Sequence, residues 1–286
     1  MAVVLSLLAA TAYGLGTVLQ QKGMLQDDDG GGTGVHFLAG LFSRPVWLAG
    51  GAVTLLGGVC QTLALRTGPL AAVQAVTTLS LVIALPFGVW LTNQQVTPRV
   101  WAGACATTAG VVLFVAVGSP QNGTRDPSTT AWWVTGVSTV VLAGALARAG
   151  ARRSGSMQAV LLGAAAGLGY GTATALAKAL TSRFAEGLGA VLTSWELYAL
   201  AAAGLLGLAM GQAALRTGAL APAMAATSSV ALLASVVLGL TVFGESFARG
   251  PGHLAAVVTG LAVAILGIAA LSRAPAARAS SPVPGV

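Results

Sequence analysis

The chain has 286 residues, of which 56% are hydrophobic and 7% are charged. Soluble domains carry about 25% charged residues, so this composition excludes an ordinary soluble protein and indicates a membrane protein. The net charge of +7 does not indicate a nucleic-acid partner, because the basic residues stand singly between apolar runs, where they orient a chain in a membrane.

The apolar runs predict nine membrane-spanning helices. Each run is about 20 residues long, the length at which a helix crosses the hydrocarbon layer, and none alternates like a barrel strand. The predicted spans are residues 2–21, 45–65, 69–91, 99–117, 130–148, 157–180, 194–215, 219–243 and 251–271. We expect the first run to be retained rather than cleaved as a signal peptide, because no basic region precedes it. The Pro-, Ala- and Ser-rich tail, residues 273–286, is expected to be disordered.

An internal repeat relates the first four spans to the last four. Nine of the fourteen residues from 64 to 77 recur 150 positions later, including the sequence Leu-Arg-Thr-Gly. At an offset of 157 residues the matched pairs are Tyr13 and Tyr170, Gly14 and Gly171, Thr17 and Thr174, and Gln21 and Lys178. The predicted units are a first repeat (1–117), a linker with the fifth span (118–156), a second repeat (157–272) and the tail.

The fold class predicted from this repeat is an all-α membrane bundle of two inverted four-helix repeats joined by a linker helix. Five spans precede the second copy, so it enters the membrane from the opposite face. One face holds Arg66, Arg125, Arg183 and Arg249. The other holds Lys22, Arg44, Arg99, Arg148, Arg152, Arg153, Arg216, Arg273 and Arg278. Nine basic residues against four place the second face in the cytoplasm of a cell membrane, with the N-terminus outside and the C-terminus inside.

Each copy of the repeated sequence reads as two helices joined by a short turn. An Arg and a Gly end the first helix of each copy, so Gly68 and Gly218 are expected in the left-handed conformation that caps helices. Replacing either with a β-branched residue is expected to damage folding.

Two matched sets of polar residues are candidates for a substrate site. The first is the stripe Tyr170, Thr174 and Lys178, repeated as Tyr13, Thr17 and Gln21. Inside a pathway Lys178 would pair with Tyr170 or a substrate anion; otherwise it snorkels to the outer surface. The second set is Gln74, Thr77 and Thr78, matched by Thr227 and Ser228, whose hydroxyls could equally bond back to their own helices.

Glycine and proline residues within the spans predict how the helices pack and bend. Gly163, Gly167 and Gly171 form a ladder on which another helix can dock closely. Pro86 and Pro222 lie inside apolar spans, where they mark either hinges or kinks absorbed by packing.

The acidic residues suggest no catalytic or metal centre. Glu196 and Glu245 lie at span ends and are expected to be interfacial anchors, and residues 27–29 form an acidic loop with at most a weak divalent-cation site. No cofactor motif or nucleophile motif is present, so we predict no enzyme and no cofactor. Cys60 and Cys105 fall near opposite ends of their spans and are not expected to pair.

The second copy resembles an EamA-type half of the drug/metabolite transporter superfamily. The resembling stretch is GALAPAMAATSSVALLASVVLGLTVFGESFARGPGHLAAVVTGLAVAILG, where Gly244 and Glu245 follow the penultimate helix. The first copy departs from it, with Gln94 and Gln95 where the acid would fall. The nine-span layout, with LQQKGMLQ ending the first span and Gln61 in the second, is also similar to NIPA-type magnesium transporters.

These features predict a secondary transporter of a small solute, with alternating access between the repeats. The candidate substrate-binding residues are Tyr13, Thr17, Gln21, Gln74, Thr77, Thr78, Tyr170, Thr174, Lys178, Thr227 and Ser228. The expected partners are a small-molecule substrate and membrane lipid, and association with a second copy of the chain is left open. The alternatives are a divalent-cation transporter and a non-transporting membrane scaffold.

Cysteine labelling tests the predicted topology in a chain whose own Cys60 and Cys105 are replaced by Ser. A cysteine at Asn122 should react with an impermeant thiol reagent in intact cells, whereas cysteines at Thr33 and Ser280 should be shielded. Labelling of both from outside would reverse the orientation, and unequal labelling of these two would contradict the number of spans.

Overall fold

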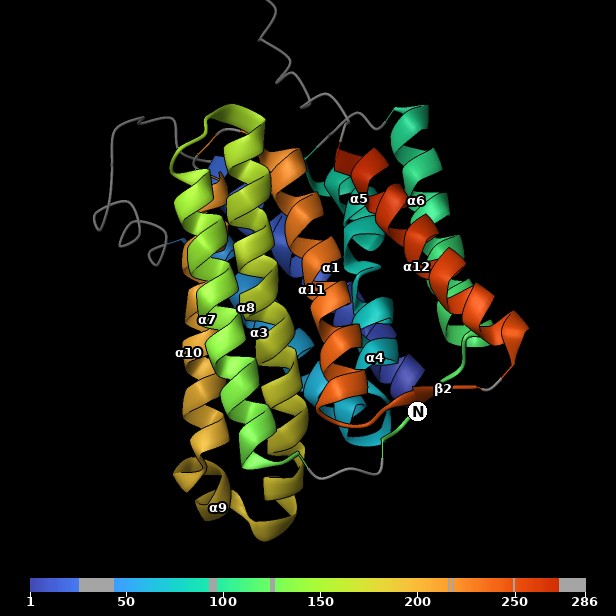
Figure 1. Cartoon of the computed structure of the whole chain (residues 1–286). Coiled ribbons are helices and arrows are strands. Elements are labelled where there is room, and N and C mark those ends of the chain that lie inside the picture. The colour runs from blue at the N-terminus through green and yellow to red at the C-terminus, as the bar shows by residue number, and fades with distance from the viewer. Residues whose placement is uncertain are drawn as a thin grey trace, which may run out of the picture.

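The computed structural model describes residues 1–25, 44–92, 97–123, 127–215, 217, 219–248 and 250–272. These residues form a bundle of long helices (Figure 1). The helices are α1 (Ala2–Leu25), α3 (Pro45–Thr67), α4 (Leu70–Thr77), α5 (Ser80–Thr92), α6 (Pro98–Val112) with the π-helix η1 (Leu113–Val117), α7 (Thr129–Gly150), α8 (Gly155–Arg183) with the 3₁₀-helix η2 (Phe184–Glu186), α9 (Leu188–Thr193), α10 (Trp195–Leu215), α11 (Leu220–Thr241) and α12 (Pro251–Ser272). Two short strands, β1 (Pro120–Gln121) and β2 (Ser246–Phe247), pair antiparallel, with Gln121 opposite Ser246.

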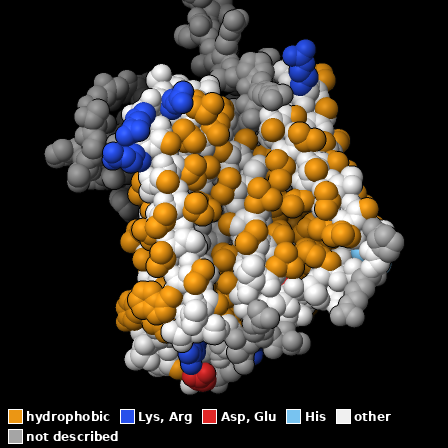
Figure 2. Space-filling model, in the orientation of Figure 1, with side chains coloured by type: hydrophobic (Ala, Val, Ile, Leu, Met, Phe, Trp, Pro, Cys, Tyr) orange, Lys and Arg blue, Asp and Glu red, His pale blue; other side chains and the backbone are white. Residues whose placement is uncertain are grey.

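The prediction of nine spans is confirmed within the described part of the chain. Nine helical stretches there are long and apolar enough to cross a membrane, one for each predicted span. The protein is therefore an all-α, multi-pass membrane protein. Hydrophobic side chains cover the visible side of the bundle, while Lys and Arg side chains lie at its ends (Figure 2). The predicted disordered tail lies outside the described residues.

The third span departs from the predicted continuous helix, because it is divided into α4 and α5 at Thr78 and Leu79. At the break, Leu79 donates to the Val76 carbonyl and Leu81 to the Thr78 carbonyl, three residues back instead of four. Hydroxyl groups that bond back to their own helix bend it, and the Thr78 hydroxyl donates to the Gln74 carbonyl just before the break. The matching helix α11 is continuous over the same register.

The two prolines do not make this break. Pro86 lies inside α5, eight residues after Thr78, and Pro222 lies in the first turn of α11. A proline in a first turn removes no helical hydrogen bond, because the N–H groups there have no partner in the helix. Pro222 therefore causes no kink. The third span is interrupted within the membrane at Thr78 and Leu79 instead.

We call the helices of Ala2–Val117 the first segment and those of Gly155–Ser272 the second segment. Within the first segment α1 packs on α3 and α5, and within the second α8 packs on α10 and α11. Glycines permit these contacts. A Cβ added at Gly57 would lie 2.9 Å from the Tyr13 ring, and one added at Gly207 would lie 2.8 Å from the Tyr170 ring. The predicted glycine ladder is also confirmed: its three members, Gly163, Gly167 and Gly171, all face α11.

Helices α6 and α12 join the two segments through a close backbone contact. A Cβ added at Gly110 would lie 2.6 Å from the Gly260 carbonyl oxygen, and one added at Gly260 would lie 2.7 Å from the Phe114 nitrogen. Farther along, Gly267 faces Gly103. As the residue number of the contacts rises along α12, it falls along α6. The two helices therefore run antiparallel.

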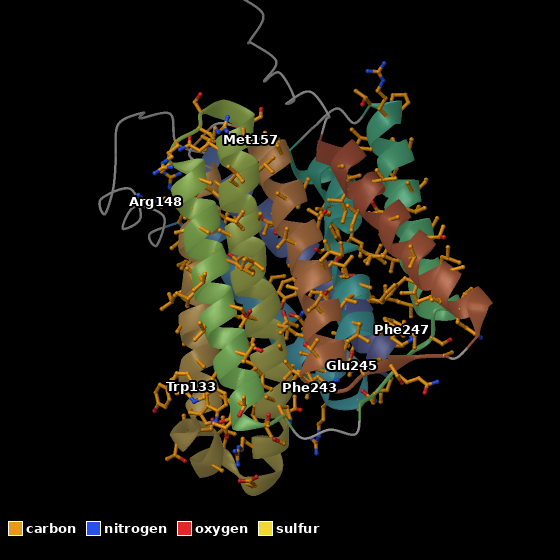
Figure 3. The ribbon with its side chains drawn as sticks, in the orientation of Figure 1. Trp133, Arg148, Met157, Phe243, Glu245 and Phe247 are labelled. Carbon is orange, nitrogen blue, oxygen red and sulfur yellow. The ribbon has the colours of Figure 1, made fainter. Side chains whose placement is uncertain are left out.

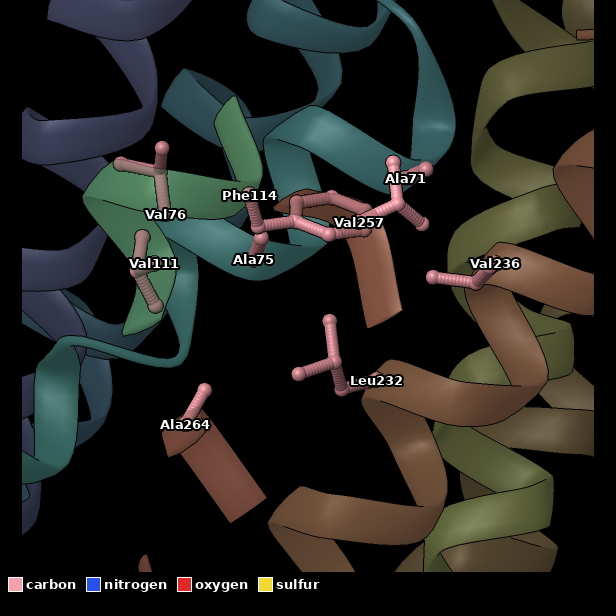
Figure 4. Close-up of a cluster of buried hydrophobic side chains, with 9 residues drawn as sticks. All are labelled: Ala71, Ala75, Val76, Val111, Phe114, Leu232, Val236, Val257 and Ala264. Carbon is pink, nitrogen blue, oxygen red and sulfur yellow. The ribbon is translucent and has the colours of Figure 1, made fainter. Parts of the chain in front are cut away.

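Two apolar clusters fill the space between the segments, and both involve α4. In the first, α4 residues pack against α6, α11 and α12 (Figure 4). This cluster comprises Ala71, Ala75, Val76, Val111, Phe114, Leu232, Val236, Val257 and Ala264. The second joins α3 and α4 to α8 and the end of α11, and comprises Ala64, Leu65, Leu70, Val73, Ala175, Val242 and Phe243. Every α4 residue except Gln74 is consequently buried.

The predicted left-handed conformation of Gly68 is wrong. Gly68 is extended, with φ −131° and ψ 159°, because the chain passes straight through Pro69 into α4. Glycine is needed there for space, since an added Cβ would lie 2.6 Å from the Cβ of Ala2. Gly218 lies outside the described residues.

The contact between α6 and α12 predicts a strong effect of Gly110→Val. The added side chain would collide with backbone atoms that cannot rotate away, so we expect a loss of about 1–3 kcal/mol in folding free energy. Thermal unfolding of the purified protein in detergent measures this loss. Gly136→Val is the matched control, because an added Cβ at Gly136 meets no atom within 4 Å. Equal melting temperatures for the two variants would contradict the contact.

Candidate functional site

Lys178 points into the protein, where its ammonium group meets the carboxylate of Glu245. The ammonium nitrogen Nζ lies within hydrogen-bonding distance of Glu245 Oε1 and 5.2 Å from the centre of the Phe243 ring. The side chains of Lys178 and Glu245 are only 13% and 2% exposed. The snorkelling interpretation of Lys178 is therefore wrong, and so is the expectation that Glu245 is an interfacial anchor.

Local backbone geometry sets the position of Glu245. Gly244 before it has φ 64°, a left-handed turn that glycine adopts without strain. The Glu245 N–H donates to the Gly239 carbonyl at 2.8 Å. Gly239 also has no side chain, and an added Cβ there would collide with the Glu245 carboxylate. The end of α11 thus leaves room for this side chain, and Figure 3 shows Glu245 and Phe243 at this end of the helix.

Both charged groups bind the first segment at the beginning of α4. The backbone N–H groups of Leu70 and Ala71 donate to the Glu245 carboxylate, the latter at 3.2 Å. Lys178 donates to the Gly68 carbonyl at 3.3 Å. The first N–H groups of a helix have no partner within it and carry partial positive charge, so a carboxylate satisfies and stabilises them. We call this group of five residues, Gly68, Leu70, Ala71, Lys178 and Glu245, the charged clamp.

The charged clamp links the two segments, and its two charged side chains lie on the same side of that contact. Lys178 in α8 and Glu245 after α11 both belong to the second segment, whereas Gly68, Leu70 and Ala71 belong to the first. The contacts between the segments are therefore hydrogen bonds from or to backbone groups, and the ion pair itself lies entirely on one side.

A second polar group links Tyr13 and Gln74 through Gln61. The Tyr13 hydroxyl donates to Gln61 Oε1 at 2.6 Å, and Gln61 Nε2 lies 3.4 Å from Gln74 Oε1. This chain connects α1, α3 and α4 within the first segment. Tyr170 repeats the ring position of Tyr13, but the residues matched to the two glutamines are Gly211 and Met224.

The hydroxyl groups of the other candidates bond back to carbonyls of their own helices. These are Thr17 to Tyr13, Thr77 and Thr78 to Gln74, Thr174 to Tyr170 and Thr227 to Ala223. Thr227 also donates to the Gly163 carbonyl at 3.0 Å, which ties α11 to α8. The structure thus gives these hydroxyls a role in helix geometry. Ser228 is half-buried, and the side chain of Gln21 lies outside the described residues.

Glu196 also is not the exposed anchor that the sequence suggested. It is 6% exposed and accepts a hydrogen bond from Arg183 at 3.1 Å. It follows Trp195, whose ring meets the ring of Trp132 edge to face. The pair lies within the second segment, apart from α4. Among the described residues, no group of three His, Cys, Asp or Glu residues is arranged to hold a metal ion. The acidic run 27–29 lies outside them.

Sequence reasoning missed Glu245, Gln61 and Phe243 as members of these groups. The Gly-Glu pair after the penultimate span was the available signal for Glu245, since a glycine before a conspicuous acid at a span end indicates a specific turn. Gln61 had no comparable signal. Its role depends on α3 and α4 folding back on each other, so that residues 13 positions apart meet.

Comparison with known proteins adds a relative but no activity. No protein-family model matches the chain, and no solved structure matches it. An uncharacterized protein of Corynebacterium glutamicum is 27% identical over 274 residues, an alignment that covers 96% of this chain and 95% of the relative. The charged clamp and the arrangement of the two segments are therefore the features that bear on function.

The charged clamp predicts a loss of stability in Lys178→Gln, contrary to what a surface lysine would give. Removing one partner of a buried ion pair leaves the other charge uncompensated and costs about 3–5 kcal/mol. Lys178→Arg keeps the charge and should lose less. Thermal unfolding in detergent measures both, with Arg148→Gln as the control, since the Arg148 side chain is exposed. A Lys178→Gln variant as stable as the wild type would contradict the pair.

Proposed function

We propose that the protein is a secondary transporter, which moves a small solute across the cell membrane by alternating access between two inverted four-helix repeats. In this proposal the first and second segments are the repeats and α7 links them. The N-terminus lies outside the cell, so the beginning of α4 and the charged clamp lie at the outer face.

Reciprocal contacts support the inverted arrangement. In the register of the repeat Gly110 matches Gly260 and Phe114 matches Ala264, and Gly110 meets Ala264 just as Gly260 meets Phe114. Contacts of this kind arise when matched elements lie around a two-fold axis. Because α6 and α12 are antiparallel, that axis is perpendicular to the helices, as in transporters with inverted repeats.

The observation that carries the proposal is that the segments are joined tightly at one end of the bundle. At that end α4 packs against α8 and α11, with the charged clamp at its first turn. Away from it, residues 80–85 of α5 and 224–230 of α11 are only half-buried. Closure at one end with looser contact at the other is the arrangement expected of one state of an alternating-access cycle.

The charged clamp is suited to opening because no ion pair has to be broken. Separating buried charges costs several kcal/mol per ion. Opening would instead exchange the hydrogen bonds at Gly68, Leu70 and Ala71 for bonds to water, while Lys178 and Glu245 stay together. The break at Thr78 and Leu79 lies at the other end of α4 and would let this short helix turn relative to α5. Gln74 lies on this moving helix and is linked by hydrogen bonds to Gln61 and Tyr13. These three polar groups are our candidates for contact with the solute.

A reversible disulfide between β1 and β2 tests the proposal. Opposite residues of an antiparallel pair have Cα atoms about 4.5–5.5 Å apart, within the range of a disulfide. Cysteines at Gln121 and Ser246, in a chain with Cys60 and Cys105 replaced by Ser, should therefore bond on oxidation and tie the clamp end shut. Uptake should fall to background when the pair is oxidised and recover when it is reduced.

The uptake assay requires a known solute, which is first identified by a growth and uptake screen of a deletion strain with magnesium, amines, amino acids and drugs.

In the disulfide experiment each single-cysteine variant serves as the control, because it cannot form the disulfide and should transport under both conditions. Uptake that continues unchanged with the disulfide fully formed would contradict alternating access at this end. Failure of the wild-type gene to alter the distribution of any solute would contradict transport.

A further inference from the structure

We propose that Glu245 is a proton-binding site that controls the charged clamp, so that uptake of one proton by its carboxylate releases α4. This inference deepens the proposed transport function by naming the ion that governs opening at the clamp end. The proton comes from water at that end and forms the carboxylic acid, and no proton is taken from Lys178 in this step.

The contacts of Glu245 are made at full strength only by its charged form. Its carboxylate is surrounded by three donors, which are the N–H groups of Leu70 and Ala71 and the ammonium group of Lys178. A carboxylate accepts from all of them, but a carboxylic acid carries a hydrogen of its own and has lost the charge that strengthens such bonds. Protonation therefore removes most of the electrostatic attraction between this carboxylate and the beginning of α4.

No other described ionisable side chain bonds to the Glu245 carboxylate. The elements packed against it are α8, which contributes Lys178, α4, which contributes backbone N–H groups, and the end of α11, which contributes Gly239 and Phe243. The turn before α4 contributes the Gly68 carbonyl, which Lys178 occupies. Arg66 in the last turn of α3 is exposed.

The other buried carboxylate provides a contrast within the same molecule. Glu196 is bonded to Arg183 at the start of α10, and both residues belong to the second segment. Its titration would leave the hydrogen bonds of α4 intact. Glu245 is therefore the group whose protonation bears directly on the contact between the segments.

Thermodynamic linkage gives the direction of the effect. The closed clamp requires the carboxylate, so the open state binds the proton more tightly and a proton favours opening. Closure is then complete at high pH and is lost as the pH falls. For a single proton, the opening equilibrium changes by at most about tenfold per pH unit.

Hydrogen–deuterium exchange of the full-length protein in lipid nanodiscs tests this without a known solute. Exchange of the peptide covering residues 70–77 is measured from about pH 7 to about pH 3, a range that extends to both sides of the ordinary glutamate pKa of about 4.3. The rates are divided by those of an unstructured peptide, which removes the intrinsic effect of pH. We expect the corrected exchange of α4 to rise as the pH falls, while the peptide covering residues 103–117 in α6 and η1 stays protected.

Glu245→Gln and Glu196→Gln are the paired variants. The first should exchange rapidly in α4 at every pH, because an amide cannot titrate and binds the donors weakly. The second should retain the pH response of the wild type. A wild-type α4 with pH-independent protection would overturn the proposal even if Glu245→Gln fails to fold, and so would a normal pH response in Glu245→Gln.

The two proposals fail separately. A protein that transports a solute but shows no pH effect on α4 would refute the proton site alone. One whose α4 opens with acid while no solute moves would refute transport and leave the proton site standing.

Discussion

The unpaired N–H groups at the beginning of α4 are the constraint on which the arrangement of the two segments depends. A helix that begins inside an apolar bundle cannot satisfy them with water, and each unsatisfied group costs several kcal/mol. Glu245 provides the acceptor for two of them. A lone buried carboxylate would be still more costly, so Lys178 has to accompany it. Gly239, Gly244 and Phe243 then follow as the residues that make room for the pair, turn the chain toward it and cover its charge.

The contacts between the segments divide into two physical kinds. In lipid there is little hydrophobic gain in bringing helices together, and association depends on close packing and hydrogen bonds. The contact between α6 and α12 uses the first means, with Gly110 and Gly260 bringing backbones together. The charged clamp uses the second. A packed backbone contact is suited to a pivot because small rotations preserve it, whereas a set of directional hydrogen bonds is either made or broken.

The sequence predicted what depends on composition and local spacing. Apolar runs located all nine spans, and the Gly163 ladder indicated a helix contact that the structure confirms, because both signals are contained in one helix. The charged clamp could not be predicted in the same way. Lys178 and Glu245 are 67 residues apart, and their partners lie more than a hundred residues from either. Gly68 was assigned a left-handed cap because that is the commonest reason for a glycine after a helix, but tertiary crowding against Ala2 is the reason here.

The repeat itself supplies the charged pair only once. By its register Lys178 and Glu245 fall on Gln21 and Gln95 in the first copy, and neutral amides cannot form an ion pair. Two copies related by symmetry but unequal in charge would close the two ends of a transporter with unequal strength. A two-state equilibrium then favours the state in which the stronger contact is made. In the described structure the contacts of the charged clamp are made, as expected from this inequality under the proposed function. Under the proposed proton site, acid at that end would reduce the inequality, since it removes the charge of Glu245, in whose place the first copy has the neutral Gln95.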